Sequence, residues 1–231
     1  MERISAVREY RLASSKEFTR KSAERPSLFQ QIRQPKSPFI VFPRVSSESR
    51  RYIPLGFAMP DVVPTDQIQY VPDATLNHFG VLTSNVHMAW MRAVAGRLEM
   101  RYRYSAQIVY NNFPWPEVGN VANVKMLPKP NPNAQLETGN IGTGNTPTMA
   151  TLISSSAQAI LDARARYPDS SLADLYDELT MPPDLRRAHQ ENDRAVMAAY
   201  GFSTKMTESE CVAELFKRYQ ALVEAKGKGR L

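Results

Sequence analysis

The sequence predicts an α+β protein in which a mixed sheet-and-helix part precedes a small all-α part. Between residues 39 and 109, apolar residues form short runs or alternate with polar ones, which indicates strands. Beyond residue 148, apolar residues recur at three- and four-residue spacing, which indicates helices. We expect a domain over residues 1–118 with a basic N-terminal arm, a flexible linker or loop over 119–148, and a helical domain over 149–231.

The first elements are a basic helix or arm and a pair of strands. Helix formers, Arg and Lys fill the chain up to Arg25, and Pro26 ends this segment. Two apolar runs, at 39–42 and 52–57, flank a polar turn and predict paired strands. Pro43 and Pro54 favour a sheet edge or a bulge, because proline cannot donate to the ladder.

A helix and one long strand are expected next. Apolar residues between Thr83 and Gly96 have helical spacing, and Gly96 is a natural C-cap. From Arg97 to Val109 apolar and charged residues alternate, which predicts a strand with an aromatic face and a charged face. The charged face would hold three side chains in one line: Glu99, Arg101 and Arg103.

Four short helices follow the linker and imply a small bundle. The first covers 149–167, and the second is indicated by the Ser-Leu-Ala-Asp motif at 171–174. The third begins after Pro182-Pro183 and ends near Gly201, and the fourth opens with a capping box at 207–210.

Charge and composition restrict the functional class. The net charge of +6 comes from residues 1–60, which hold 12 Lys/Arg against 5 Asp/Glu. Such a segment suits a polyanion such as DNA, although a solvated basic surface gives the same composition. No apolar run reaches the roughly 18 residues of a membrane span, there is no signal-like stretch, and the lone Cys211 cannot pair internally. We expect a cytoplasmic protein without a membrane partner.

No catalytic or cofactor motif stands out in the sequence. The three histidines lack ligand spacing, and the glycines of the 139–144 loop follow no strand, which argues against a nucleotide fingerprint. Residues 111–116 superficially resemble the Asn-Pro-Pro-aromatic motif of amino-methyltransferases but lack adjacent prolines, so an aromatic-proline turn is favoured. We expect no catalytic, cofactor-binding or metal-binding residue in this chain, and leave open whether it is an enzyme.

The charged strand face matches the chemistry of base recognition. Arg forms bidentate bonds with guanine and Glu accepts from the cytosine amino group, so Glu99, Arg101 and Arg103 could read neighbouring base pairs. A solvated, salt-bridged strand face remains the alternative. Four other arginines are candidates for phosphate contacts, which position a protein without specifying sequence: Arg50, Arg51, Arg92 and Arg97.

Several ordered segments closely resemble MmeI-like Type II restriction-modification DNA methyltransferases. Those of the first half are 50–57 (RRYIPLGF), 79–84 (FGVLTS), 93–98 (AVAGRL), 103–105 (RYS) and 110–116 (YNNFPWP). Those of the second half are 159–164 (AILDAR), 172–177 (LADLYD) and 181–189 (MPPDLRRAH). The chain is similar to the target-recognition domain and the helical C-terminal domain of that family.

This resemblance implies a module that selects the DNA sequence for an adenine-specific, S-adenosylmethionine-dependent methyltransferase. It implies base recognition at Glu99, Arg101 and Arg103, and at a second cluster, Asp66 and Gln67. The cofactor would be bound by the parent enzyme, and the partners would be double-stranded DNA and the methyltransferase catalytic domain or subunit. The alternative is a protein-interaction or assembly subunit without direct base readout.

Overall fold

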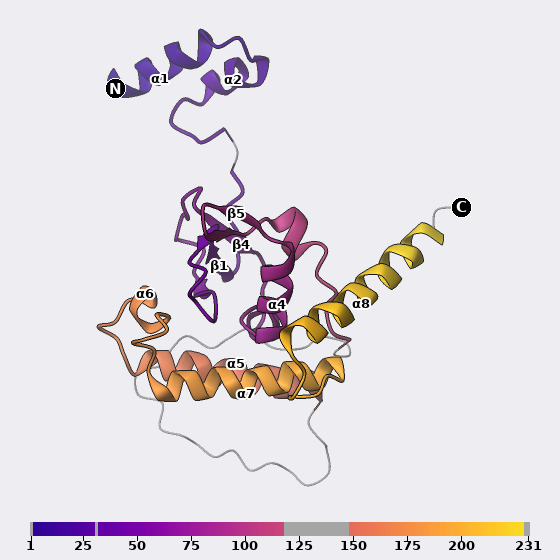
Figure 1. The fold of residues 1–231 in the computed structure, drawn as a ribbon. Coiled ribbons are helices and arrows are strands. Elements are labelled where there is room, and N and C mark those ends of the chain that lie inside the picture. The colour runs from indigo at the N-terminus through magenta and orange to yellow at the C-terminus, as the bar shows by residue number, and fades with distance from the viewer. Residues whose placement is uncertain (1, 31, 118–147, 229–231) are drawn as a thin grey trace. The chain divides into compact units, whose positions relative to one another are not determined.

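A computed structural model describes residues 2–30, 32–117 and 148–228 of the chain (Figure 1). The chain divides into two compact units, Met1–Lys36 and Ser37–Leu231. Two sheets and several helices occur in the second unit, so the α+β class is confirmed. Among the described residues, no helix combines the length and the apolarity that crossing a membrane requires.

The first unit contains α1 (Glu2–Leu12), α2 (Glu17–Lys21) and the 3-10 turn η1 (Ser22–Glu24). The guanidinium of Arg11 donates to the carbonyl oxygens of Ser22, Arg25 and Leu28 at 2.8–2.9 Å and so ties α1 to the chain after it. The basic segment expected before Pro26 is therefore largely helical. Over residues 1–36 the chain carries 9 Lys/Arg against 4 Asp/Glu.

The second unit begins with a three-stranded antiparallel sheet in the order β3-β1-β4. The central strand β1 (Phe39–Pro43) lies between β3 (Gly56–Ala58) and β4 (Ile68–Val71). The pairing of two runs around a polar turn was predicted correctly, with Ile40 opposite Phe57. The prediction from Pro43 that its strand lies at a sheet edge is wrong, because β1 is the central strand. However, β3 pairs only with residues 39–41, so β1 has a neighbour on one side only at Pro43. No hydrogen bond is lost there, although proline lacks an N–H.

A second antiparallel sheet has the order β2-β6-β5 and departs from the predicted strand. Instead of one strand over 97–109, the chain forms β5 (Gly96–Leu98), a two-residue turn and β6 (Arg101–Arg103). The third strand is β2 (Val45–Ser46), and a π-helical turn, η2 (Ala106–Tyr110), follows β6.

Two short helices connect the sheets, α3 (Leu76–Leu82) and α4 (Asn85–Val94). Ser84 caps α4 by accepting from the His87 amide. The predicted C-cap at Gly96 is wrong, because α4 ends at Val94, its C-cap is Ala95 in an extended conformation, and Gly96 opens β5.

All four predicted C-terminal helices are present in the predicted order. They are α5 (Met149–Ala165), α6 (Leu172–Leu175), α7 (Pro183–Tyr200) and α8 (Glu208–Lys228). Figure 1 shows α5 and α7 side by side, and α8 beginning beside α4 and then leading away from it. The aromatic ring of Trp90 in α4 lies 5.0 Å from Phe216 and 5.9 Å from Tyr219. The predicted linker, 119–148, lies outside the described residues except for Thr148.

Helices α5 and α7 share their core with the sheet-and-helix part. Gly80 in α3 lies so close to α5 that an added Cβ would be 2.7 Å from Cγ2 of Ile153. Asn192 in α7 donates through Nδ2 to the Gly80 carbonyl at 2.8 Å, and the Tyr200 hydroxyl donates to the Pro114 carbonyl at 2.8 Å. The segments before residue 118 and after residue 147 are thus joined by buried contacts within the second unit.

Candidate nucleic-acid interface

The β5–β6 hairpin separates buried aromatic side chains from exposed arginines. Along β6 and the residue after it, Tyr102 and Tyr104 are buried while Arg101 and Arg103 are exposed. Arg103 lies opposite Val45 of β2 and Gly96 of β5, so the open face of this sheet is built around the two arginines. The predicted separation into an aromatic and a charged face is therefore present along β6.

Glu99 lies in the turn of the hairpin, and the predicted single line of three charged side chains is wrong. The pairing of Leu98 with Arg101 leaves Glu99 and Met100 as a two-residue turn. Glu99 has a φ of +56°, as the first central position of a type II′ turn requires. The prediction failed because neither turn residue is Gly or Asn, the usual signal for such a turn. The Glu99 carboxylate still meets the Arg101 guanidinium at 2.8 Å.

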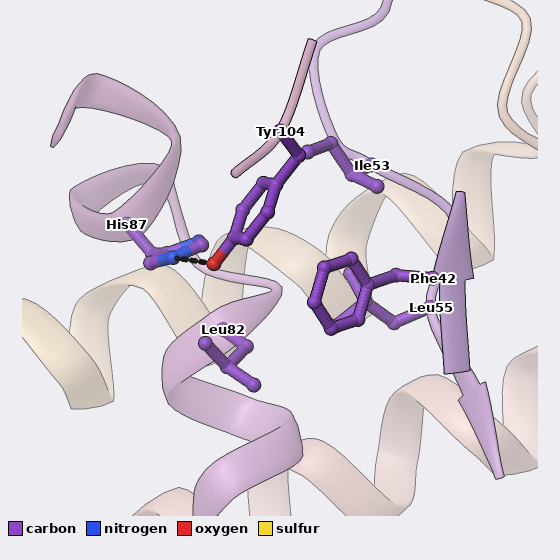
Figure 2. Close-up of a pocket in the computed structure, with 6 residues that line it drawn as sticks. All are labelled: Phe42, Ile53, Leu55, Leu82, His87 and Tyr104. Atoms are coloured by element: carbon purple, nitrogen blue, oxygen red, sulfur yellow. Dashed lines mark hydrogen bonds between the residues drawn. The ribbon is translucent and has the colours of Figure 1, made fainter. Parts of the chain in front are cut away.

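The end of the hairpin rests on a tightly filled apolar pocket. Figure 2 shows the ring of Tyr104 entering it, lined also by Phe42, Ile53, Leu55, Leu82 and His87. The Tyr104 hydroxyl lies 3.0 Å from Nε2 of His87, and its ring packs edge-on against Phe42. Burial lowers the pKa of His87 to about 4 and raises that of Tyr104, so both are uncharged at neutral pH. The pocket leaves no space for a water-sized molecule, so it anchors the sheet and is not a ligand site.

Arg44 brings the second predicted cluster next to the end of β6. Its amide donates to the Gln67 carbonyl at 2.9 Å and its Nη1 donates to the Asp66 carbonyl at 3.0 Å. The Arg44 carbonyl accepts from the Tyr104 amide at 2.8 Å. The side chains of Asp66 and Gln67 are exposed and lie 3.3 Å apart. Backbone hydrogen bonds through Arg44 therefore connect the second predicted cluster to the end of β6.

Sequence reasoning missed Arg44. It stands two residues after the apolar run at 39–42 and carries no motif of its own. Only the strand pairing on either side of it, which sequence periodicity does not reveal, shows that it connects two exposed clusters. We call the set of Arg44, Asp66, Gln67, Glu99, Arg101 and Arg103, which the backbone pairing of β2, β4 and β6 links, the arginine face.

The arginines expected to contact phosphates differ in their surroundings. The guanidinium of Arg97 lies 3.8 Å above the Tyr102 ring and donates to the Met100 carbonyl at 2.9 Å. Arg92 forms a two-point ion pair with Glu208, at 2.7 and 2.9 Å. Arg51 is exposed and donates to the Tyr52 hydroxyl at 3.3 Å, whereas Arg50 is half-buried. Arg92 would have to leave its carboxylate partner to bind phosphate.

Each histidine has a structural partner. His78 completes the capping box of α3 with Thr75, and His189 lies 2.7 Å from the Tyr176 hydroxyl. Burial lowers the pKa of both. Over the described ranges, no group of three or more His, Cys, Asp or Glu side chains is arranged as metal ligands.

The 111–116 segment is an aromatic turn inside the fold. Phe113 and Trp115 pack edge to face at 5.4 Å, and Phe113 also contacts Tyr200 of α7. The aromatic-proline turn favoured by the sequence is therefore what the chain forms.

Comparison with known proteins assigns the family. Residues 1–117 match the family described as "MmeI, target recognition domain", and residues 146–225 match "MmeI, C-terminal domain". The chain belongs to the MmeI family. The chain thus carries two domains of that family, the target recognition domain followed by the C-terminal domain.

Two similar proteins extend the comparison. DNA methyltransferase A of Bacillus subtilis (strain 168) is 35% identical over 223 residues, which cover 96% of this chain and 22% of that protein. The Type IIL restriction-modification enzyme MmeI, solved in complex with DNA, matches with a TM-score of 0.76 and 41% identity, over 96% of this chain and 26% of that one. The chain thus spans about a quarter of the length of these relatives.

Proposed function

We propose that this chain is the sequence-specific DNA-recognition module of an adenine-specific, S-adenosylmethionine-dependent methyltransferase of a restriction-modification system. The observation that carries the proposal is the arginine face. Its guanidinium, carboxylate and amide groups lie next to strands that the buried side chains of Tyr102 and Tyr104 hold in place. These groups match the major-groove code: Arg for guanine, Gln for adenine, and Glu or Asp for the cytosine amino group. Membership of the target-recognition family supports the same function.

Base contacts are assigned to Glu99, Arg101 and Arg103 on the hairpin, and to Asp66 and Gln67 beside it. Arg44 joins them, because its side chain already lies against the Asp66 backbone. The Glu99–Arg101 ion pair is exposed, and such pairs contribute at most about 1 kcal/mol, so base edges can replace it at little cost.

Phosphate contacts are assigned to Arg97, Arg50 and Arg51, and to the basic first unit. Arg92 is retained only as a secondary candidate, because Glu208 already neutralises it. Counterion release at phosphates makes this part of the binding dependent on salt.

The cofactor and the catalytic partner are assigned to the parent enzyme outside this chain. The pocket under the hairpin does not fit S-adenosylmethionine, because it is apolar and has no space even for a water-sized molecule. The role left to this chain is to bind and orient the duplex for a methyltransferase domain or subunit. We propose a location in the bacterial cytoplasm, where the proposed DNA substrate is found.

The test is selection from a random-sequence duplex pool by the full chain, alone and combined with the methyltransferase portion of its parent, at two salt concentrations. We expect an enriched sequence and weaker binding at the higher salt concentration. Exchanging the charges with Glu99→Lys and Arg101→Glu should change the enriched sequence at one or two positions and leave the thermal unfolding temperature unchanged.

A matched exchange in α7, Glu191→Lys with Arg194→Glu, is the control. These residues also form an exposed Glu–Arg ion pair, but they lie outside the arginine face. It should select the same sequence as the unchanged chain. If neither exchange affects selection, or if no sequence is enriched even with the methyltransferase portion present, the chain is an assembly subunit and not a base reader.

A further inference from the structure

The tip of the β5–β6 hairpin carries exposed apolar side chains among charged ones. Met100 is 70% exposed and Leu98 is 43% exposed. Leu98 lies directly opposite Arg101, and Met100 precedes that arginine in the chain. Single exposed apolar residues are common on protein surfaces, so exposure alone does not indicate a function.

Interactions of Arg97 and Glu99 hold the turn that contains Met100. The Met100 carbonyl accepts from Nη1 of Arg97, whose guanidinium lies on the Tyr102 ring. Glu99 holds a positive φ that non-glycine residues adopt at a cost, and its carboxylate is paired with Arg101. A rigid turn fixes the position of its side chains before a partner arrives, which reduces the entropy lost on binding.

The neighbours of Met100 define the groove that it would enter. Glu and Arg discriminate C·G from G·C only in the major groove, because the minor groove presents a nearly degenerate pattern. The major groove, about 12 Å wide, also admits a two-stranded ribbon such as this hairpin. The apolar group that a base offers there is the C5-methyl of thymine.

We propose that Met100, flanked by Leu98, contacts a thymine C5-methyl group in the major groove, beside the base pairs faced by Glu99 and Arg101. This inference rests on the proposed DNA-recognition function. It adds an apolar contact to a surface that otherwise reads DNA through polar groups, and makes the hairpin tip selective for thymine at one position.

The test replaces each thymine of the enriched duplex in turn by deoxyuridine, which lacks only the C5-methyl group. Affinity is measured for the full chain combined with the methyltransferase portion of its parent. One replacement should weaken binding about 3- to 5-fold, the effect of losing one buried methyl group. Met100→Ala should abolish that sensitivity, and Met100→Leu should retain it.

Met149→Ala is the control, because Met149 is also exposed but begins α5. It should keep the full response to deoxyuridine. The inference is overturned if no replacement weakens binding, if the Met100→Ala chain responds like the unchanged one, or if 2-aminopurine fluorescence shows that Met100 separates stacked bases. Sequence selection without methyl sensitivity overturns the role of Met100 alone, whereas absence of any selection overturns the proposed function.

Discussion

Gly80 shows how closely α3 approaches the C-terminal helices. A Cβ at this position would lie 2.7 Å from Cγ2 of Ile153, 2.9 Å from Oδ1 of Asn192 and 3.2 Å from Cβ of Ala157. Asn192 is also bonded to the Gly80 carbonyl, so it cannot move away without losing a buried hydrogen bond.

Gly80→Ala is therefore expected to lower the free energy of unfolding by roughly 1–3 kcal/mol, the usual cost of overpacking a core. Urea denaturation of the full chain measures it. Gly56→Ala is the matched control, because an added Cβ there meets only Cδ1 of Leu172, at 3.9 Å. Equal stabilities of the two variants would show that α3 and α5 are not in close contact at Gly80.

The sequence predicts the exposure of some residues of the arginine face but not the position of others. Alternation with Tyr102 predicts that Arg101 and Arg103 are exposed, because a strand places successive side chains on opposite faces. Arg44 was not predictable, because its importance depends on two strand pairings that are distant in sequence.

At the level of elements, the β5–β6 hairpin is where sequence periodicity misleads. Apolar and charged residues alternate from Leu98 to Tyr104, yet the chain reverses direction within that pattern at Glu99 and Met100. The helices after residue 148 were predictable, because caps and prolines mark their ends.

The positive φ of Glu99 predicts a conflict between stability and recognition in this hairpin. Glycine adopts this conformation without steric cost, so Glu99→Gly should raise the free energy of unfolding by up to about 1 kcal/mol and weaken sequence selection. Thermal unfolding and duplex selection on the same preparation measure both effects. Glu48→Gly, at an exposed position without a positive φ, is the control and should not be stabilising. A less stable Glu99→Gly chain would contradict the expected strain.

At the scale of the whole second unit, a buried polar network joins residues before 118 to α7. The Tyr52 hydroxyl donates to Oδ2 of Asp193 at 2.7 Å, and the Asn85 amide at the start of α4 donates to Oδ1 at 2.7 Å. The ring of His189 stacks on Tyr52 at 4.2 Å. Sequence patterns did not predict this network, because its partners are more than 100 residues apart and have no spacing that marks them.

Asp193 makes the stability of this junction dependent on pH. Burial raises the pKa of Asp193 to about 6, and the bonds from Tyr52 and Asn85 offset it only in part. Between pH 4 and 6 Asp193 binds more protons in the folded chain than in the unfolded chain. Its contribution to the free energy of unfolding is therefore full at low pH and is lost as pH rises through about 6. The loss amounts to roughly 3 kcal/mol, because each pKa unit corresponds to about 1.4 kcal/mol.

Buried His87 and His189 act in the opposite sense, because burial lowers their pKa, so Asp193 must be isolated by comparing the unchanged chain with Asp193→Asn. Urea denaturation at pH 4 to 7 should show that the stability of the unchanged chain falls relative to Asp193→Asn as pH rises. Tyr52→Phe removes a hydrogen bond that favours the carboxylate, so in that background the relative loss should extend to higher pH. A stability difference that is constant over this range would mean that Asp193 is not buried at the junction and that α7 is not held to the start of α4 through it.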